Sequence, residues 1–318
     1  CNVAALTTNE KGRTSFEYIT TTDDIVFDYA PSVLPPKKFF FPQEETLLKF
    51  SSDGEVAAYV ESTPTVLFGV RPCDLNGIKI LLEAFSETYG DPNVLTKRED
   101  LIIIGIECGS LCDEDAFCYK VKSNEAQGGY DILLIEKEDH YLVVSSNFKG
   151  REYLEKYVSM SSGKEEEVKA FYAEKKSSFK KVGEPFKNLD KLPELFAKNK
   201  QHPVWKEEGD RCLSCGSCVM VCPTCYCFDV VDEWKLNLKD GERIRRWDGC
   251  MLRNFTKVAG GELFREEPEN RLHHRINRKF NYLMKKHGMS VCVGCGRCVK
   301  GCLADISPKT IAEAISEA

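Results

Sequence analysis

Residues 212–229 read CLSCGSCVMVCPTCYCFD and place six cysteines within 18 positions. A cysteine that only fills a core behaves as a small hydrophobic residue and has no need of such crowding. The first four of the six follow the spacing CxxCxxCxxxCP; they are Cys212, Cys215, Cys218 and Cys222. The spacing CxxCxxCxxxC returns near the end of the chain, at Cys292, Cys295, Cys298 and Cys302. The two runs form an internal repeat, which indicates that both hold the same kind of group.

The compact CxxCxxCxxxC spacing is the one with which thiolates hold a 4Fe-4S cluster in bacterial ferredoxins. A four-thiolate zinc site is the alternative, but zinc sites usually join two CxxC pairs through a long spacer. In two-cluster ferredoxins the fourth cysteine of each run ligates the other cluster. We therefore assign the first cluster to Cys212, Cys215, Cys218 and Cys302. The second cluster is assigned to Cys292, Cys295, Cys298 and Cys222.

Composition and charge exclude several other classes of protein. The chain has 318 residues, of which 42% are apolar, so it can bury the cores of two domains. Its apolar runs are too short to span a membrane, and a net charge of -6 argues against binding nucleic acid. No signal peptide is visible, and disulfide frameworks belong to small secreted domains. We expect a cytoplasmic, oxygen-sensitive chain with reduced thiols.

The first part of the chain has the pattern of an α/β domain. Short apolar runs at residues 65–70 and 100–107 predict buried strands, and residues 74–90 between them have helical spacing. Strand, helix, strand is typical of a parallel crossover. Residues 130–146 predict a hairpin, and a charged, helical linking segment follows. We predict an α+β fold, with an N-terminal α/β domain in residues 1–200 and a helical dicluster ferredoxin-like domain in residues 201–318.

A long insert, residues 223–291, separates the two cysteine runs and must have structure of its own. Residues 269–288 predict a helix with an apolar stripe, formed by Leu272, Ile276, Phe280 and Leu283. Basic residues share this helix, namely Arg271, Arg275, Arg278 and Lys279. They form either a solvated face or a face for an acidic partner or a negatively charged cluster region. His273 and His274 are expected on the helix rather than on a metal.

Four cysteines of the N-terminal part follow the predicted parallel strands; they are Cys73, Cys108, Cys112 and Cys118. Ligands of α/β sheets gather at the carboxyl ends of strands, so these thiols predict a third 4Fe-4S cluster, with zinc and unrelated thiols as alternatives. Three more cysteines are Cys225, Cys227 and Cys250. They are interpreted as buried small hydrophobic residues, with a redox-active pair or a swapped cluster ligand as the other two hypotheses.

A cluster with four cysteine ligands has no open position for a substrate, so electron transfer is its expected task. No dinucleotide or triphosphate motif is present, and we predict no catalytic residue in this chain. Two rival hypotheses stay open. One is a disulfide redox enzyme that works beside a cluster, and the other is a scaffold that carries zinc.

Several longer motifs together resemble one known family. They are PPKKFFFPQEETLLKF from Pro35, GVRPCDLNGIKIL from Gly69, the first cysteine run with its flanks, RRWDGC from Arg245, AGGELFR from Ala259 and CVGCGRCVKGC from Cys292. The chain resembles the iron-sulfur beta subunits of cytoplasmic NAD(P)-linked hydrogenases, the sulfhydrogenases, a family that includes the A subunit of anaerobic sulfite reductase. The similarity extends from about residue 30 to the end of the chain.

The resemblance implies an electron relay between two partners. One is a flavin- and NAD(P)-binding subunit similar to ferredoxin reductase, and the other is a catalytic or small electron-transfer subunit. It leaves open a hydrogenase, a sulfite or sulfur reductase, or a bifurcating transhydrogenase. Family members tend to have Cys-Phe-Cys where this chain has Ala116, Phe117 and Cys118. The first cysteine of that family motif is thus absent from this chain, and we assign Cys112 as the cluster ligand in its place.

Overall fold

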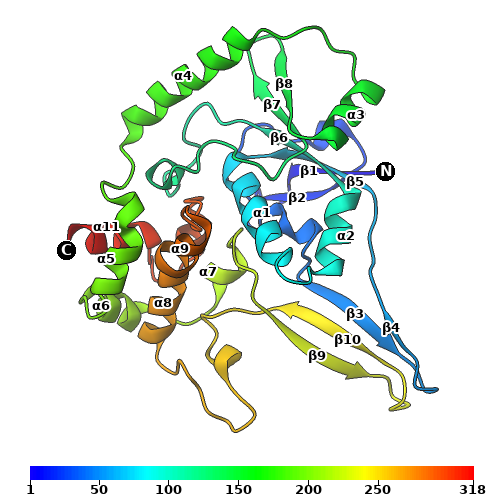
Figure 1. Ribbon diagram of the computed structural model, residues 1–318, viewed down its shortest axis with the longest axis vertical. Helices are drawn as coiled ribbons and strands as arrows, with labels where there is room; N and C mark the ends of the chain where they lie inside the picture. The colour runs from blue at the N-terminus through cyan, green and yellow to red at the C-terminus, as the bar shows by residue number, and fades with distance from the viewer.

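Six strands form the larger of two β-sheets in the computed structural model, which describes residues 1–318 (Figure 1). The strand order is β2-β1-β5-β6-β7-β8. The four inner strands are parallel, and β2 and β8 are antiparallel edge strands. The strands are β1 (Asn2–Thr8), β2 (Thr14–Ile19), β5 (Thr65–Val70), β6 (Leu101–Ile106), β7 (Ile132–Glu136) and β8 (Tyr141–Ser145).

The predicted parallel crossover is present between β5 and β6, where Thr65 pairs with Leu101. The connection holds two helices instead of one, α1 (Pro72–Phe85) and α2 (Pro92–Asp100). The second helix begins at a proline, and the Asp91 side chain accepts a hydrogen bond from the backbone N–H of Val94. These are ordinary helix-start signals, and they explain why the helical pattern is interrupted. The predicted hairpin is also present, as β7 and β8.

The core of the larger sheet lies between its strands and α1. Leu75, Ile78 and Leu81 of α1 belong to one buried cluster with Leu67 and Ile103 of the strands. Gly105 in β6 permits this close packing. A Cβ at that position would lie 2.6 Å from Leu75 Cδ1 and 3.2 Å from the carbonyl oxygen of Val70. The packing fixes the start of α1 at the carboxyl end of β5.

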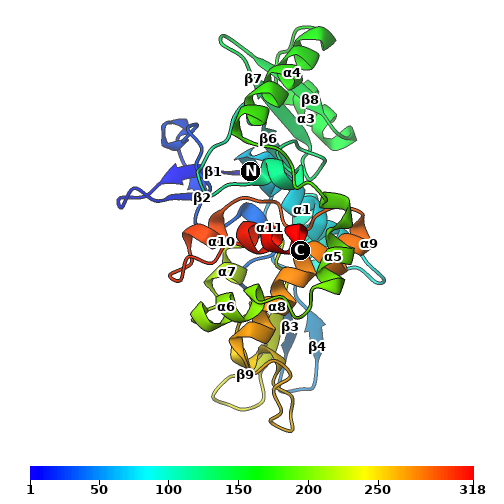
Figure 2. The same cartoon turned by 90° about the vertical axis from the view of Figure 1, so that its left-hand side faces the viewer.

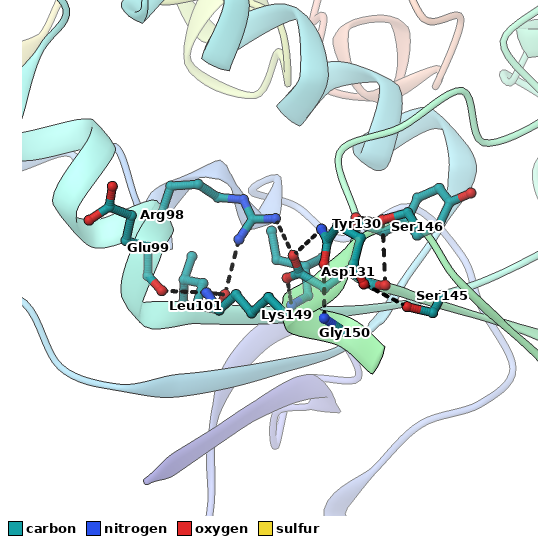
Figure 3. Close-up of polar contacts among 11 residues, drawn as sticks. Arg98, Glu99, Leu101, Tyr130, Asp131, Ser145, Ser146, Lys149 and Gly150 are labelled. Atoms are coloured by element: carbon teal, nitrogen blue, oxygen red, sulfur yellow. Dashed lines mark hydrogen bonds and ion pairs between the residues drawn. The ribbon is translucent and has the colours of Figure 1, made fainter. Parts of the chain in front are cut away.

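Asp131 ties several elements together just before β7 (Figure 3). The buried carboxylate accepts hydrogen bonds from the backbone of Ile103 at 2.8 Å and from the side chains of Arg98 and Asn147 at 2.9 Å each. Arg98 belongs to α2, and Asn147 caps α3 (Phe148–Tyr157). Burying a carboxylate is costly unless it is paired and hydrogen-bonded, and Asp131 meets both conditions. One side chain therefore fixes the positions of α2, β6 and α3 relative to one another.

The second sheet joins distant parts of the chain. Its order is β4-β3-β10-β9, and all neighbours are antiparallel. The strands are β3 (Glu44–Phe50), β4 (Val56–Ala58), β9 (Phe228–Trp234) and β10 (Gly241–Trp247). The hairpin of β9 and β10 lies in the insert for which only a helix was predicted. Since β3 and β10 come from opposite sides of residue 200, the two proposed domains share this sheet, and the boundary stays a prediction.

The helical part surrounds a second hydrophobic core, to which Phe196, Trp205, Ile276, Phe280 and Ile315 contribute. The predicted helix at residues 269–288 is present, and Leu272, Ile276 and Phe280 are buried while Leu283 is half-buried. Its middle widens into a π-helical turn. The helices here are α5 (Leu192–Lys198), α6 (Val204–Arg211), α7 (Ser217–Met220), α8 (Pro268–Asn277), the π-helix (Arg278–Tyr282), α9 (Leu283–His287), α10 (Arg297–Lys300) and α11 (Pro308–Glu317).

The long helix α4 (Glu165–Val182) connects the hairpin of β7 and β8 to the helical part (Figure 1). It was predicted as a solvated linker, and most of it is exposed. Phe171, Lys175 and Phe179 are nevertheless buried, and Lys175 forms an ion pair with Glu107 in which both side chains are fully buried. The linker is thus anchored beside Cys108.

The C-terminal helices α10 and α11 lie at a height between the two sheets in Figure 2. Both cysteine runs are therefore close to the centre of the molecule. None of the helices combines the length and the apolar composition that crossing a bilayer requires. Short 3-10 helices are Thr22–Asp24, Pro36–Phe39, Cys118–Val121, Leu189–Lys191 and Arg253–Thr256.

Candidate metal centres

One small cavity is lined by three thiols of the first cysteine run and by the last thiol of the second run. These thiols belong to Cys212, Cys215, Cys218 and Cys302. Apolar side chains form much of the remaining wall, among them Met251, Leu272 and Ile306. The combination of thiols from both runs is the crossed set that the spacing predicts for one cluster.

Local backbone geometry shapes this first cavity. The loop begins where α6 ends, and Ser214 and Gly216 both have positive φ, at 53° and 79°. A Cβ on Gly216 would lie 2.7 Å from Leu252 Cδ2, so the loop needs glycine both for its conformation and for its packing. Arg271 of α8 donates a hydrogen bond of 2.7 Å to Ser214 Oγ. The turn therefore has a fixed shape.

A second cavity is lined by the other crossed set, Cys222, Cys292, Cys295 and Cys298. Gly294 and Gly296 in its loop have positive φ and touch residues 115–118. A Cβ on Gly294 would lie 2.6 Å from the backbone nitrogen of Cys118. Phe117 donates a backbone hydrogen bond of 2.7 Å to the carbonyl of Gly294. The second run is thus packed directly against the segment that contains Cys118.

A buried ion pair attaches the same loop to α1. Arg297 donates to both carboxylate oxygens of Asp74, at 2.6 and 2.7 Å, and to the carbonyl of Ser32 at 2.6 Å. Tyr29 Oη donates to the same carboxylate at 3.0 Å. Asp74 follows Cys73 in the first turn of α1, so this ion pair brings Cys73 close to the second cavity.

The four N-terminal thiols gather at the carboxyl edge of the parallel strands. Burial first, and then the neighbouring thiols of Cys108 and Cys112, raise the pKa of Cys118 to about 12. Burial likewise raises the pKa of Cys108 to about 12. Cys112 acts electrostatically on each of the other three, Cys73, Cys108 and Cys118.

The three groups follow one another in space. Arg275 lines both the first and the second cavity, and the loop of the second run packs against the segment that contains Cys118 of the third group. The middle group thus adjoins both outer ones. No three His, Cys, Asp or Glu side chains are arranged to hold a metal ion by themselves.

The chemistry of the donors fits a sulfur-rich, positively charged guest. Burial raises the pKa of Cys218 and of Cys295 to about 12 each, so both thiols stay protonated unless something stabilises the thiolate. A bound metal does so, because thiol ligands lose their protons when they coordinate. A hydrogen bond with Ser217 lowers the pKa of the exposed Cys215. Wholly thiol donor sets hold iron-sulfur clusters or zinc, and the compact spacing of the two runs favours the cluster.

The basic side chains of the π-turned helix point toward the thiols. Arg275 lines both cavities, is 4% exposed and donates to the carbonyl of Cys218 at 3.2 Å. Burial alone would lower its pKa, yet the thiols of Cys218 and Cys298 raise it well above the ordinary value. Lys279 is also buried and donates to Thr224 Oγ1 at 2.6 Å. The solvated-face interpretation is therefore wrong for Arg275 and Lys279.

The other basic residues of this helix also divide into buried and partly exposed ones. Arg271 is buried as well, whereas Arg278 is half-buried and donates to Tyr226 Oη at 2.7 Å. His273 packs its ring edge against Trp205, with 4.6 Å between ring centroids. Lys37 is a buried cation that sequence reasoning missed, although the Pro-Pro-Lys-Lys motif that contains it was noticed. It donates a hydrogen bond of 2.5 Å to the carbonyl of Cys225.

The fold and the donor sets define an iron-sulfur protein, and comparison with known proteins agrees. Residues 211–306 match the 4Fe-4S dicluster domain family. Over 306 residues the chain is 35% identical to sulfhydrogenase 2 subunit beta of Pyrococcus furiosus, which covers 95% of this chain and 89% of that protein. No solved structure matches. The chain belongs to the family of sulfhydrogenase beta subunits and is an iron-sulfur electron-transfer subunit of a hydrogenase-type complex.

Proposed function

We propose that this chain relays single electrons through three 4Fe-4S clusters, between a flavin- and NAD(P)-binding subunit and a further redox centre. The observation that carries the proposal is the adjacency of three thiol groups: Arg275 lines both cavities, and the loop of the second run packs against the segment that contains Cys118. A bound 4Fe-4S cluster supplies reversible one-electron transfer. The ligands we propose for the third cluster are Cys73, Cys108, Cys112 and Cys118.

Exposure at both ends of the row supports a relay. Leu213 and Leu303 line the first cavity and are 63% and 86% exposed, so apolar surface is available to a partner beside that cavity. At the other end, Cys112 is half-buried in the partly exposed loop of residues 109–114. Cys295 of the middle group is buried, as are Cys73 and Cys118 of the third group. Electrons can then enter at one end and leave at the other.

The chain's own side chains have three tasks in this function. Their thiols hold the clusters at fixed places, and their apolar walls keep water away. Arg275 and Lys279 supply buried positive charge next to thiolates, which favours the extra negative charge of a reduced centre. This arrangement needs no proton donor or nucleophile, in agreement with a relay that has no substrate site of its own.

Removal of one thiol tests the third cluster. The complex is purified without oxygen from cells that carry Cys118→Ser, and iron and acid-labile sulfide are measured per chain. Relative to the parent we expect a loss of about four iron and about four sulfide. The control variant is Cys1→Ser, because Cys1 is exposed and lies at the amino edge of the parallel strands, opposite the edge that carries the third group. An unchanged iron content in Cys118→Ser, or zinc without sulfide in the parent, would overturn the proposal.

We further propose a hydrogenase as the complex in which the relay works, because the relative is named a sulfhydrogenase. Sulfite or polysulfide reduction and bifurcating transhydrogenation are the alternatives. Copurification identifies the companion subunits, and hydrogen-dependent reduction of NAD⁺ and of NADP⁺ tests the activity. A companion with a flavin and a hydrogen-activating subunit are expected, and their absence from the purified complex would contradict this setting.

A further inference from the structure

Three cysteines that belong to none of the three groups line one more cavity. They are Cys225, Cys227 and Cys250. The first two precede β9, and the third follows β10. Pairing of Phe228 with Trp247, and a hydrogen bond of 3.2 Å from Asp248 N to the carbonyl of Cys227, hold the two ends of this hairpin together. The second sheet therefore brings these thiols to one place.

We call this the fourth cavity, because it comes after the two cavities of the ferredoxin-like runs and the N-terminal thiol group. It resembles the two cavities of those runs. All three contain several thiols and share Arg275 in their walls. Arg278 and Lys279 complete the basic lining of the fourth. Buried cysteines that only fill space are surrounded by apolar groups, whereas these three thiols have cations beside them. These basic surroundings indicate a site whose occupied form carries net negative charge.

Buried cations next to the cavity have no carboxylate partner. Lys37, 2% exposed, donates to the carbonyl of Cys225, and its Nζ lies 4.0 Å from the centre of the Trp247 ring. Lys279 donates only to oxygens of Thr224. Arg275 is 4% exposed, and its Nε has no hydrogen-bond partner. Unpaired buried charge is strongly unfavourable, so thiolates and the group they hold must together carry net negative charge to balance these cations.

The clusters of the first two cavities can balance Arg275, which touches both. Lys37 lies in none of the three cavity walls, but it donates to the backbone of Cys225, which lines the fourth cavity. A disulfide would leave the third thiol unused and would provide no negative charge. An iron-sulfur cluster uses all three thiolates and carries net negative charge.

We propose that Cys225, Cys227 and Cys250 hold a fourth iron-sulfur cluster through three thiolates, beside the first two. The inference deepens the proposed function, since it rests on this chain binding clusters, but it is independent of the third cluster. Arg275 lines this cavity as well as the first two, and the backbone N–H of Cys225 donates to the carbonyl of Cys222 of the second cavity at 3.4 Å. The fourth centre is therefore a side branch where the first two meet. Three thiolates leave one iron available to a small exogenous ligand.

The test compares matched cysteine variants in the whole complex, purified without oxygen. Cys227→Ser and Cys250→Ser are each expected to lose about four iron and about four sulfide per chain. The double variant should lose no more than either single variant, because both remove the same cluster. Cys118→Ser serves as the control for loss of a different cluster, and its loss should add to that of Cys250→Ser. Electron paramagnetic resonance should retain the signals of the ferredoxin-like pair in both single variants.

The parent complex gives a second measurement that does not depend on how the variants fold. Anaerobic native mass spectrometry of the complex should assign four 4Fe-4S clusters to this subunit, about sixteen iron, against about twelve if the three remaining cysteines hold no cluster. About twelve iron in this subunit of the parent, with no loss of iron in Cys250→Ser, would overturn the inference and leave the proposed relay standing. Unchanged iron in Cys250→Ser, or a disulfide between two of the three thiols detected by alkylation and mass spectrometry, would also overturn it. Zinc without sulfide would overturn the relay itself.

Discussion

Arg275 is the residue on which the electrostatics of the cysteine-lined cavities depend. It lines three of them and is buried without a carboxylate partner. Reduction adds negative charge to a cluster. Positive charge at this position therefore stabilises the reduced state of a cluster in each cavity that it lines. In the sequence alone, Arg275 is one of several basic residues on a predicted helix. Its importance comes from where the helix places it.

Replacing Arg275 by methionine should lower the reduction potentials of the neighbouring clusters. A unit charge roughly 8 Å away at an effective dielectric constant near 20 contributes about 2 kcal/mol, which corresponds to a decrease on the order of 100 mV. Redox titration followed by electron paramagnetic resonance measures the change. Arg275→Lys keeps the charge and should stay close to the parent, and equal potentials in both variants and the parent would contradict the prediction.

The buried pair of Arg297 and Asp74 should be important for both stability and cluster occupancy. Asp74→Asn removes the partner of a buried guanidinium, and we expect a loss of about 3–5 kcal/mol in the free energy of unfolding. Anaerobic denaturant unfolding measures it. Asp232→Asn is the control, because it breaks an exposed ion pair with Arg243 that water screens and that contributes little to stability. Similar losses in the two variants would show that the buried pair is not special.

At the scale of elements, short loops with positive φ form the cysteine runs, and longer elements fix their positions. The loop of the second run is wedged between α1 and the segment that contains Cys118. The loop of the first run begins at α6 and is supported by α8. A change in one of these contacts should therefore affect more than one thiol group.

Gly294→Ala tests this coupling. The new Cβ would meet the backbone of Phe117 and Cys118 at 2.6 Å, so the loop and the neighbouring segment must move apart. We expect reduced iron in both the second and the third group, measured per chain and by electron paramagnetic resonance. Gly261→Ala is the matched control, since Gly261 also has positive φ but nothing lies within 4 Å of its Cβ position. Equal iron loss in the two variants would attribute the effect to φ alone.

At the scale of the whole molecule, two long-range connections hold the parts of the chain together. One is the second sheet, in which β3 pairs with β10. The other is α4, which leads from the larger sheet to the helical part and buries Lys175 against Glu107 (Figure 1). Glu107 directly precedes Cys108, and its carboxylate also accepts a hydrogen bond of 3.0 Å from the backbone of Ala126.

Lys175→Met should destabilise the protein through this connection. It leaves the fully buried Glu107 without its cation, at an expected cost of about 3–5 kcal/mol in the free energy of unfolding. Because Cys108 is adjacent, the third group should lose iron before the other two when the variant is heated anaerobically. Lys176→Met changes an exposed residue on the same helix and should change stability by less than about 0.5 kcal/mol. Simultaneous iron loss from all groups would contradict the prediction.

The sequence by itself determined the features whose cause is local. The cysteine spacing predicts two cluster runs because three thiols at three-residue intervals surround one guest, and the alternation of buried strands and helix predicts the parallel crossover. The structure has that crossover and lines each cavity with the crossed set of thiols. The helix at residues 269–288 was also predictable, because its apolar stripe has helical period.

Only the tertiary structure decided which distant residues meet. Nothing local in residues 44–50 or 241–247 specifies that they pair, so the second sheet was missed, and with it the convergence of Cys225, Cys227 and Cys250. Buried cations such as Lys37 and Arg275 look like surface residues in a sequence, because charged side chains are normally exposed. Their burial becomes favourable only when folding places them beside thiolates. Long-range pairing and the charge that surrounds each thiol therefore belong to the folded chain.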